Sequence, residues 1–275
     1  MNFPKTNIMN VFENGSITYL NFKIIDDLDF VKQAVSTRWG GVSSINGLES
    51  LNLGSHTADS IENVRENYKR FCTAAGFDAD RVVLGKQTHS ANVRYVTEAD
   101  LGKGVFRERD YTDVDALITD KKNIPLVIHT ADCVPVCIID TAKKVIGAAH
   151  CGWRGTYARL AQKCINEMKT EFSSRAEDMV CTVGPCICKS CYEVSEDLYD
   201  KFAEEFSASD ATEKRDGKFF LDLAAINRQI LIESGVKPHN ISVSDLCTCC
   251  NTEWFFSHRG QGPQRGIFAT FLEIV

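Results

Sequence analysis

Two side chains in the middle of this sequence have the types and spacing that could hold one transition-metal ion: the thiol of Cys133 and the imidazole of His150. A turn at Thr141-Ala-Lys-Lys144 separates them, and the flanking apolar runs predict a β-hairpin. Strands that pair around this turn have residue numbers summing to about 283–285, which puts Cys133 within a pair or so of His150. Opposite residues of a hairpin have Cα atoms roughly 4.5–5.5 Å apart. Cys133 and His150 can therefore bind the same ion.

A third ligand candidate is His89, in the segment Gln87-Thr-His-Ser90 between two other expected strands. Two imidazoles and one thiolate suit zinc, with water in the fourth position at a pKa of about 7. The same residues also fit a simpler interpretation, since a histidine at a strand edge is often hydrogen-bonded structure and a free cysteine is often buried. His129 could compete as a ligand, although on an extended strand it lies about 13 Å from Cys133.

The remaining cysteines include two clusters in the second half of the chain. The twelve cysteines are numerous, but the chain is long and shows no basic and apolar export signal, so thiols or metal ligands are expected rather than disulfides. Cys188-x-x-Cys191 has the spacing of zinc ligands, and the other cluster can complete a set of four. Buried thiols are the alternative. The clusters are Cys181, Cys186, Cys188 and Cys191, and Cys247, Cys249 and Cys250.

Mixed strands and helices must position these residues. The expected strands are 17–25, 81–84, 92–97, 116–119, the run 126–139, 145–149, 180–183, 241–244 and 266–271. Helices are expected after Asp59, which can cap a helix that ends at Gly76, after Thr156, and over 195–206 and 223–233. The order predicts an α+β fold, a single layered domain of mixed β-sheets with flanking helices that spans residues 1–275.

Composition and charge narrow the classes of function. The sequence is 44% hydrophobic and 25% charged, with a net charge of −6. This acidic balance argues against a protein that binds nucleic acid non-specifically. No stretch is apolar enough to span a bilayer. We therefore expect a cytoplasmic protein with no nucleic-acid or membrane partner, either a monomer or a small homo-oligomer.

Several motifs together resemble one family, the laccase-domain family, also called multicopper polyphenol oxidase-like and typified by YfiH and YlmD. The resemblance runs from about residue 30 to the C-terminus, and the two hairpin motifs are specific in combination. The motifs are Thr37-Arg-Trp-Gly-Gly-Val-Ser43, Leu51-Asn-Leu-Gly54, Gln87-Thr-His89, Asp113-Val-Asp-Ala-Leu117, Thr130-Ala-Asp-Cys-Val-Pro135, Ala149-His-Cys-Gly-Trp-Arg-Gly155, Gly184-Pro-Cys-Ile187 and Cys191-Tyr-Glu-Val194.

The resemblance implies a catalytic zinc held by His89, Cys133 and His150. It also implies purine nucleoside phosphorylase activity on adenosine, inosine, guanosine and methylthioadenosine, together with adenosine deaminase activity. Copper is associated with the family as an alternative metal. A laccase role fits poorly, because no two histidines here are two residues apart, and the H-x-E and P-C-x-x-C signature of cytidine deaminases is absent.

Phosphorolysis needs a site for an anion, and arginine suits bidentate binding of phosphate. The candidates are Arg38, Arg154, Arg259 and Arg265, of which Arg154 is expected just before a helix N-terminus that would favour phosphate. Asn52 and Gln87 are candidates for hydrogen bonds to the base or ribose. Asp132 is a candidate proton donor, but a structural role is equally expected because its side chain should point opposite to that of Cys133.

Two other classes of function compete. In a cysteine hydrolase, Cys133 would be the nucleophile and His150 its base. The other class is a binding or editing protein for cell-wall precursors, with nucleoside turnover as a side activity.

Overall fold

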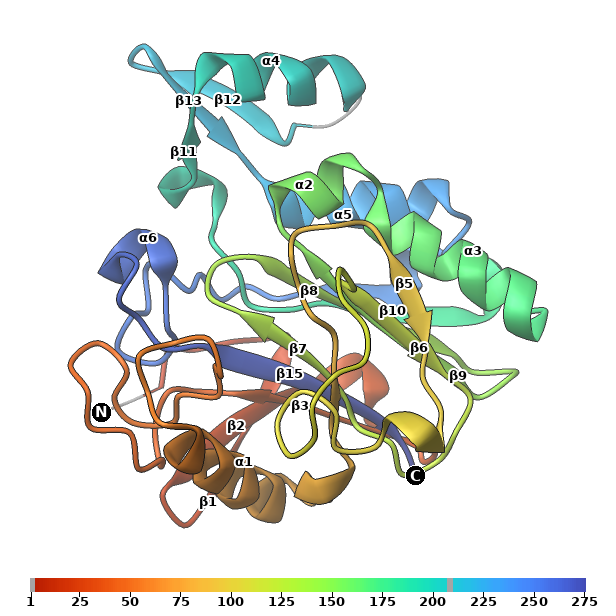
Figure 1. The fold of residues 1–275 in the computed structure, drawn as a ribbon. Coiled ribbons are helices and arrows are strands. Elements are labelled where there is room, and N and C mark those ends of the chain that lie inside the picture. Colours follow the sequence, from red (N-terminus) through yellow and green to blue (C-terminus); the bar gives the residue numbers. More distant parts are fainter. Residues whose placement is uncertain (1–2, 207–209) are drawn as a thin grey trace.

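The computed structural model describes residues 3–206 and 210–275, and within these residues two six-stranded sheets lie against one another (Figure 1). Helices cover their outer faces, and the α+β class predicted from the sequence is confirmed. No helix in the described part of the chain is long and apolar enough to cross a membrane.

The first sheet has the strand order β1-β2-β3-β15-β7-β4. Its neighbours are antiparallel except for β4 and β7, which are parallel. The central strand β15 comes from the C-terminus of the chain. The strands are β1 (Met9–Asn14), β2 (Ile17–Phe22), β3 (Val31–Ser36), β4 (Val83–Leu84), β7 (Leu126–Thr130) and β15 (Phe268–Ile274).

The second sheet has the strand order β14-β10-β8-β9-β6-β5 and contains the predicted hairpin as β8 and β9. Val136 pairs with Ala149 and Val134 with Cys151, so the residue numbers of each pair sum to 285, within the predicted range. The strands are β5 (Val93–Tyr95), β6 (Ala116–Thr119), β8 (Val134–Asp140), β9 (Val145–Cys151), β10 (Met179–Val183) and β14 (Ile241–Val243).

Every residue of β8 and β9 is buried, because both faces of the second sheet are covered. Val134, Val136 and Ile138 pack in a cluster with the helices, whereas Cys137 and Ile139 pack in the cluster between the two sheets. The alternation of strand faces is therefore present, but both faces are apolar.

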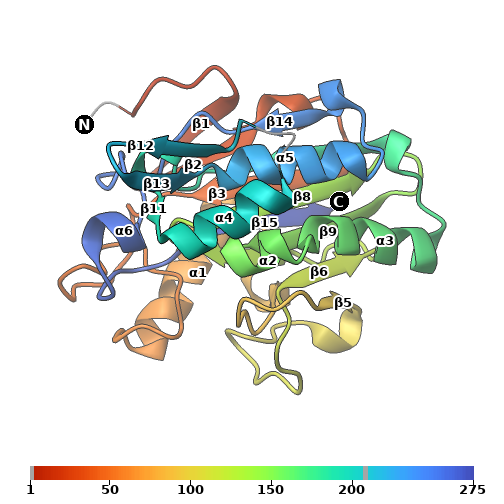
Figure 2. The same ribbon diagram turned by 90° about the horizontal axis from the view of Figure 1, so that it is seen from above.

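The helices lie in two outer layers. Figure 2 shows α2, α3 and α5 across the face of the second sheet that points away from the first sheet. Helix α1 packs Tyr68 and Phe71 against the first sheet. The helices of these layers are α1 (Ile61–Ala75), α2 (Trp153–Tyr157), α3 (Leu160–Phe172) and α5 (Leu223–Glu233).

Two helix starts differ from the prediction. The N-cap of α1 is Ser60 and not Asp59, because the Ser60 side chain accepts the backbone N–H of Asn63. Thr156 does not cap a helix either: it lies inside α2, which begins after Gly152, and α3 begins after Arg159 in a left-handed conformation. The predicted C-cap at Gly76, with a φ of 77°, is confirmed.

The apolar run 126–139 forms two strands, and Cys133 lies directly before the second of them. The chain leaves the first sheet at the end of β7 and enters the second sheet at the start of β8, and residues 131–133 form the bend between them. Asp132 has a φ of 92° in this bend. Because β7 and β8 are both almost fully buried, hydrophobicity does not reveal the break.

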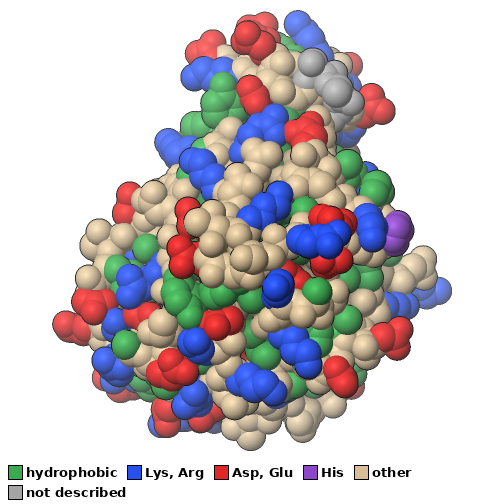
Figure 3. Space-filling model, turned by 90° about the vertical axis from the view of Figure 1, so that its right-hand side faces the viewer, with side chains coloured by type: hydrophobic (Ala, Val, Ile, Leu, Met, Phe, Trp, Pro, Cys, Tyr) green, Lys and Arg blue, Asp and Glu red, His purple; other side chains and the backbone are tan. Residues whose placement is uncertain are grey.

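A small three-stranded sheet, in the order β11-β13-β12, stands above the second sheet together with α4 (Figure 1). Figure 3 shows this part as a narrower lobe, and on that face positive and negative side chains are interspersed. The elements are β11 (Glu193–Val194), α4 (Glu196–Glu205), β12 (Thr212–Arg215) and β13 (Lys218–Leu221). A last short helix, α6 (His258–Gln261), precedes β15. The 3-10 helices are Lys23–Ile25, Ala79–Arg81, Glu98–Asp100, Ala176–Asp178, Lys189–Cys191 and Pro238–Asn240.

Candidate metal centre and its pocket

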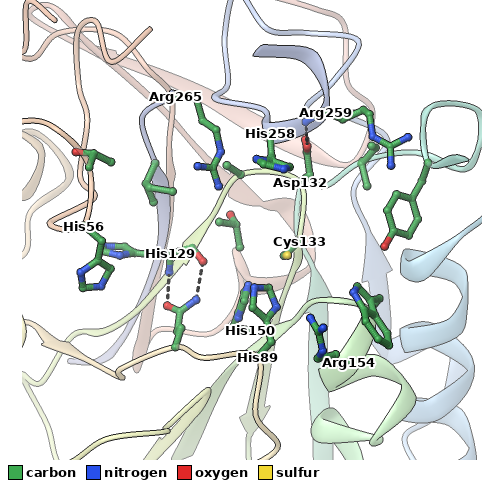
Figure 4. A pocket seen from close by; sticks show the side chains of 18 of the residues that line it. His56, His89, His129, Asp132, Cys133, His150, Arg154, His258, Arg259 and Arg265 are labelled. Atoms are coloured by element: carbon green, nitrogen blue, oxygen red, sulfur yellow. Dashed lines mark hydrogen bonds between the residues drawn. The ribbon is translucent and has the colours of Figure 1, made fainter. Parts of the chain in front are cut away.

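Three segments that are distant in sequence bring His89, Cys133 and His150 together. His89 lies between β4 and β5, Cys133 in the bend between β7 and β8, and His150 in β9. Their ligand atoms all lie within 4.8 Å of one another. Figure 4 shows the two imidazoles beside the sulfur of Cys133. This arrangement allows two nitrogen atoms and one sulfur atom to bind one cation.

The buried carboxylate of Asp115, directly before β6, holds two of these three segments. It accepts hydrogen bonds from the backbone N–H groups of Thr88, His89 and Ser90, at 2.8–3.1 Å. The Nδ1 atom of His150 donates to the same carboxylate at 2.8 Å. This bond leaves Nε2 of His150 as the free ring nitrogen, which is the way a carboxylate commonly orients a metal-binding histidine.

The two imidazoles have different electrostatic environments. Partial burial of the ring, and then the neighbouring His150, lower the pKa of His89, so its ring is neutral at pH 7. Burial acts in the same direction on His150, but the nearby sulfur of Cys133 and the carboxylate of Asp115 outweigh it and raise the pKa of His150 to about 9. In the metal-free protein His150 therefore carries a proton that a metal ion must displace.

The backbone around the three side chains is specialised. A Cβ atom built on Gly152 would lie 2.6 Å from Nδ1 of His89 and 3.0 Å from Sγ of Cys133, so a side chain at position 152 would occupy the space between the ligands. His89 itself has a φ of 63°, and Asp132, next to Cys133, has a φ of 92°. Such left-handed residues cost on the order of 1–3 kcal/mol each and concentrate at functional sites.

The three side chains lie on the wall of a cavity of about 490 Å³, a volume typical of sites for small molecules. Four of the residues predicted to bind substrate also line it: Gln87, Arg154, Arg259 and Arg265. In Figure 4, Arg265 and Arg259 lie on one side of Cys133 and Arg154 on the other. The cavity can therefore receive an anion close to the ligand atoms.

The three arginines are held differently. The guanidinium of Arg259 donates to the carbonyl oxygens of Cys191 and Glu193. Arg154, inside α2 and not before it as predicted, is exposed and stacks on the ring of Trp153, 4.3 Å from its centroid. The buried Nε of Arg265 has no hydrogen-bond partner in the described residues. An unpaired buried guanidinium nitrogen favours an anionic ligand, because a buried donor without an acceptor is costly.

Two other predicted side chains in the wall have their polar atoms occupied. The amide of Gln87 exchanges two hydrogen bonds with the backbone of His129 (dashed lines in Figure 4). Asp132 accepts bonds from the hydroxyl of Thr248, at 2.7 Å, and from the backbone N–H of Arg259, at 2.6 Å. The structure therefore favours the structural interpretation of Asp132 over a role as proton donor.

Arg38 and Asn52, which were also predicted to bind substrate, are not among the residues that line the cavity. The guanidinium of Arg38 donates to the carbonyl oxygens of Glu49 and Thr252 and lies over the ring of Phe256. Asn52 is fully buried and bonds to the backbone of Gly54 and Ile267. Both side chains fix loops, and residue type alone could not distinguish this role from ligand binding.

Several side chains of the site were not predicted from the sequence. His56, Trp153, Tyr192 and His258 line the cavity without having been predicted. Burial raises the pKa of Tyr192 to about 12, so its phenol remains a hydrogen-bond donor at neutral pH. These four residues come from loops and short helices, where no periodic pattern indicates which side chains face a cavity.

His129 also lines the cavity, but it is not one of the three converging ligands. Its Nε2 lies 2.6 Å from the hydroxyl of Tyr68, and burial lowers the pKa of His129 to about 3. The bend between β7 and β8 does not bring it to Cys133. His150, across the hairpin, takes that place instead, as the predicted register required.

The chain is similar to known proteins in both sequence and structure. Residues 32–275 match the family model described as multi-copper polyphenol oxidoreductase laccase. The chain is 31% identical to the purine nucleoside phosphorylase YlmD of Bacillus subtilis (strain 168), over 96% of this chain and 98% of that protein. It is 32% identical to the adenosine deaminase RL5 of an unknown prokaryotic organism, over 88% and 95% of the two chains. The crystal structure of the hypothetical protein YfiH of Bacillus licheniformis superposes with a TM-score of 0.90 at 30% identity, over 98% of this chain and 100% of that chain.

Proposed function

Since this chain belongs to the multi-copper polyphenol oxidoreductase laccase family, we propose that it is a zinc-dependent purine nucleoside phosphorylase that also deaminates adenosine. The expected nucleosides are adenosine, inosine, guanosine and methylthioadenosine. Relatives named as a phosphorylase and as a deaminase support both activities. The observation that carries the proposal is the convergence of two imidazoles and one thiol at the wall of a cavity with the size of a small-molecule site.

The donor set fits zinc. His89, Cys133 and His150 provide one sulfur and two nitrogen atoms, which suits zinc and leaves a coordination position open. Asp115 supports His150 in the way that outer carboxylates support metal ligands, and Gly152 leaves the space between the ligands clear. When bound, zinc supplies Lewis-acid chemistry, that is, it polarises an oxygen atom and acidifies water. Copper is the alternative metal, because imidazole and thiolate also bind copper.

The protein's own residues bind and orient the two substrates. The partly buried guanidinium of Arg265, with its unpaired Nε, binds phosphate, and the exposed Arg154 reaches it from the other side of Cys133. Trp153 and Tyr192 offer aromatic faces against which a purine can stack. Tyr192 and His258 are the cavity residues best suited to donate a proton or hydrogen bond to the base.

The test combines elemental analysis with chromatography of adenosine and inosine incubated with and without phosphate. We expect adenine and hypoxanthine to appear only with phosphate, and adenosine to give inosine in its absence. Cys133→Ala should remove one zinc and both activities, whereas Cys249→Ser, at a cysteine outside the three ligands, should remove neither. Full turnover by Cys133→Ala would refute the proposed site.

Arg265→Ala separates the two reactions. Only phosphorolysis uses phosphate, so this variant should raise the KM for phosphate about 10-fold or more, which corresponds to loss of a charge-assisted bond of about 1.5–3 kcal/mol. Deamination of adenosine should change little and serves as an internal control for folding. An equal fall in both rates would mean that Arg265 does not act on phosphate.

A cysteine hydrolase is the second candidate, because Cys133, His150 and Asp115 are also arranged as a Cys–His–Asp triad. The imidazole of His150 interacts with the Cys133 thiol and bonds to Asp115 at 2.8 Å. This is the arrangement of a nucleophile, a base and a group that orients the base. The two candidates differ in their inhibitors: a hydrolase should survive chelators and lose activity on thiol alkylation, whereas the zinc enzyme should lose activity with chelators.

A further inference from the structure

Four cysteines outside the pocket form a second cluster of possible metal ligands. Cys188-Lys-Ser-Cys191 and Cys247-Thr-Cys-Cys250 are two C-x-x-C segments, and the four outer sulfur atoms all lie within 4.8 Å of one another. Four sulfurs around one zinc ion at 2.3 Å would lie about 3.8 Å apart. We propose that these four thiolates hold a structural Zn²⁺ ion, distinct from the ion at His89, Cys133 and His150.

Backbone hydrogen bonds already shape the cluster as a thiolate site. The Sγ atom of Cys247 accepts the backbone N–H of Cys188 at 3.3 Å and that of Cys250 at 3.4 Å. The Sγ atoms of Cys191 and Cys250 are 3.4 Å apart. Since N–H donors stabilise a negative sulfur, Cys247 is prepared to bind a metal as a thiolate.

The crowding of the thiols has an electrostatic consequence. Four thiolates cannot all be negative at this distance without a cation, and a divalent ion removes the repulsion.

The other cysteines show that the clustering is specific. All twelve are free thiols in the structure, and most of those outside the two metal sites are packed in the core. Cys249 lies between two of the proposed ligands in sequence, yet it is not part of the cluster. It therefore provides a matched control in the same loop.

A zinc ion at this position would join two loops that carry the wall of the pocket. Tyr192, which lines the pocket, directly follows Cys191, whose carbonyl oxygen accepts a bond from Arg259. Thr248, between Cys247 and Cys250, donates to the carboxylate of Asp132 next to Cys133. The proposed ion would thus fix one side of the pocket without touching the substrate, and its existence does not depend on the proposed activity.

The experiment measures metal in the full-length protein. In Cys133→Ala, which lacks the first site, we expect about one zinc ion per chain. Adding Cys188→Ser and Cys191→Ser should remove that zinc, and adding Cys249→Ser should not. Co²⁺ in place of the remaining zinc should give the sulfur-to-cobalt charge-transfer absorption of a tetrahedral tetrathiolate site. We expect this absorption in Cys133→Ala and in Cys133→Ala with Cys249→Ser. We do not expect it in Cys133→Ala with Cys188→Ser and Cys191→Ser.

A second measurement covers the case in which the triple variant does not fold. In the Cys133→Ala protein, where only the four-cysteine site remains, a zinc chelator should make four additional thiols reactive toward a thiol reagent, and added zinc should protect them again. Failure of the proposed catalytic site would look different, because wild type and Cys133→Ala would then contain equal zinc and the serine variants would still lose it. Zinc-free Cys133→Ala, iron in place of zinc, or two disulfides at these cysteines would overturn the proposal.

Discussion

At the scale of single residues, the carboxylate of Asp115 connects the proposed metal ligands. Asp115→Asn keeps the size of the side chain but removes its charge and puts an N–H donor where the loop donors and His150 need an acceptor. We expect zinc affinity to fall about 10–100-fold, as for other outer carboxylates of metal sites. Competition with a chromogenic chelator measures this change.

Asp113→Asn is the control for that variant. Asp113 is an exposed residue in the same segment and bonds to the side chains of Thr88 and Asn92. Because its hydrogen bonds go to Thr88, Ser90 and Asn92 and not to a ligand side chain, its replacement should leave zinc affinity within about 2-fold of wild type. Similar losses in both variants would show that the segment as a whole, and not Asp115, determines affinity.

The protonation of His150 makes metal binding depend on pH. The folded, metal-free protein raises the pKa of His150 from 6.5 to about 9, so the interaction of the imidazolium with Cys133 and Asp115 stabilises the metal-free fold fully below about pH 6.5. That stabilisation is lost as the pH rises through about 9. Zinc competes with the proton, and its affinity should rise roughly tenfold per pH unit between about pH 7 and 9.

Calorimetric titration of the metal-free protein carrying Cys188→Ser and Cys191→Ser, in which only the site at His89, Cys133 and His150 remains, measures this proton in buffers of different ionisation enthalpy. About one proton from His150 should be released per zinc ion bound at pH 7, and the partly buried His89, with its lowered pKa, should contribute none. An affinity that does not change across this pH range would contradict the proposed protonation state of His150.

At the scale of secondary structure, the short connection from β9 to α2 leaves room for the metal ligands because it contains a glycine, Gly152. Gly152→Ala places a methyl group 2.6 Å from a ring nitrogen of His89 and 3.0 Å from the sulfur of Cys133. Overpacking of this kind costs about 1–3 kcal/mol, so zinc affinity should fall about 5-fold or more. Elemental analysis after dialysis against a weak chelator reveals the loss.

The metal-free forms provide the control for this variant. Gly152 caps α2 with ordinary extended backbone, at a φ of −65°, so alanine causes no backbone strain there. Circular dichroism of metal-free Gly152→Ala should match that of the metal-free wild type. A variant that keeps its zinc would mean that the ligands can move apart without cost.

Some of the secondary-structure elements could be predicted from the sequence and others could not. The β8–β9 hairpin, its register and α5 could be predicted because turn residues and apolar patterns are local properties. The break at residues 131–133 could not be predicted, since β7 and β8 are both apolar and the bend arises from the change of sheet. The role of Asp115 was also hidden, because its partners come from two other segments that only the folded chain brings together.

At the scale of the whole molecule, the proposed catalytic ligands connect the two large sheets. His89 and Cys133 both lie where the chain crosses from the first sheet to the second, and His150 lies in the second sheet. A metal ion bound only by the folded state stabilises it by about 4.1 kcal/mol when its free concentration is 1,000 times Kd. Removing zinc should therefore lower the unfolding temperature by roughly 10 °C.

Calorimetry of the wild-type protein before and after chelation tests that shift, and re-addition of zinc should reverse it. In Cys133→Ala the shift should be smaller, because only the four-cysteine site remains to respond. Equal shifts in the two proteins would show that the ion at His89, Cys133 and His150 does not hold the sheets together.

Because the chain crosses between the two sheets at the proposed metal ligands, the metal should also affect how fast the protein is degraded in a cell. A metal-depleted molecule would open more often between its sheets, and proteases degrade such opened molecules before they can close again. Both the amount of the protein and its turnover number would then depend on the zinc concentration in the cell. Zinc deficiency would therefore lower the number of enzyme molecules as well as the activity of each one.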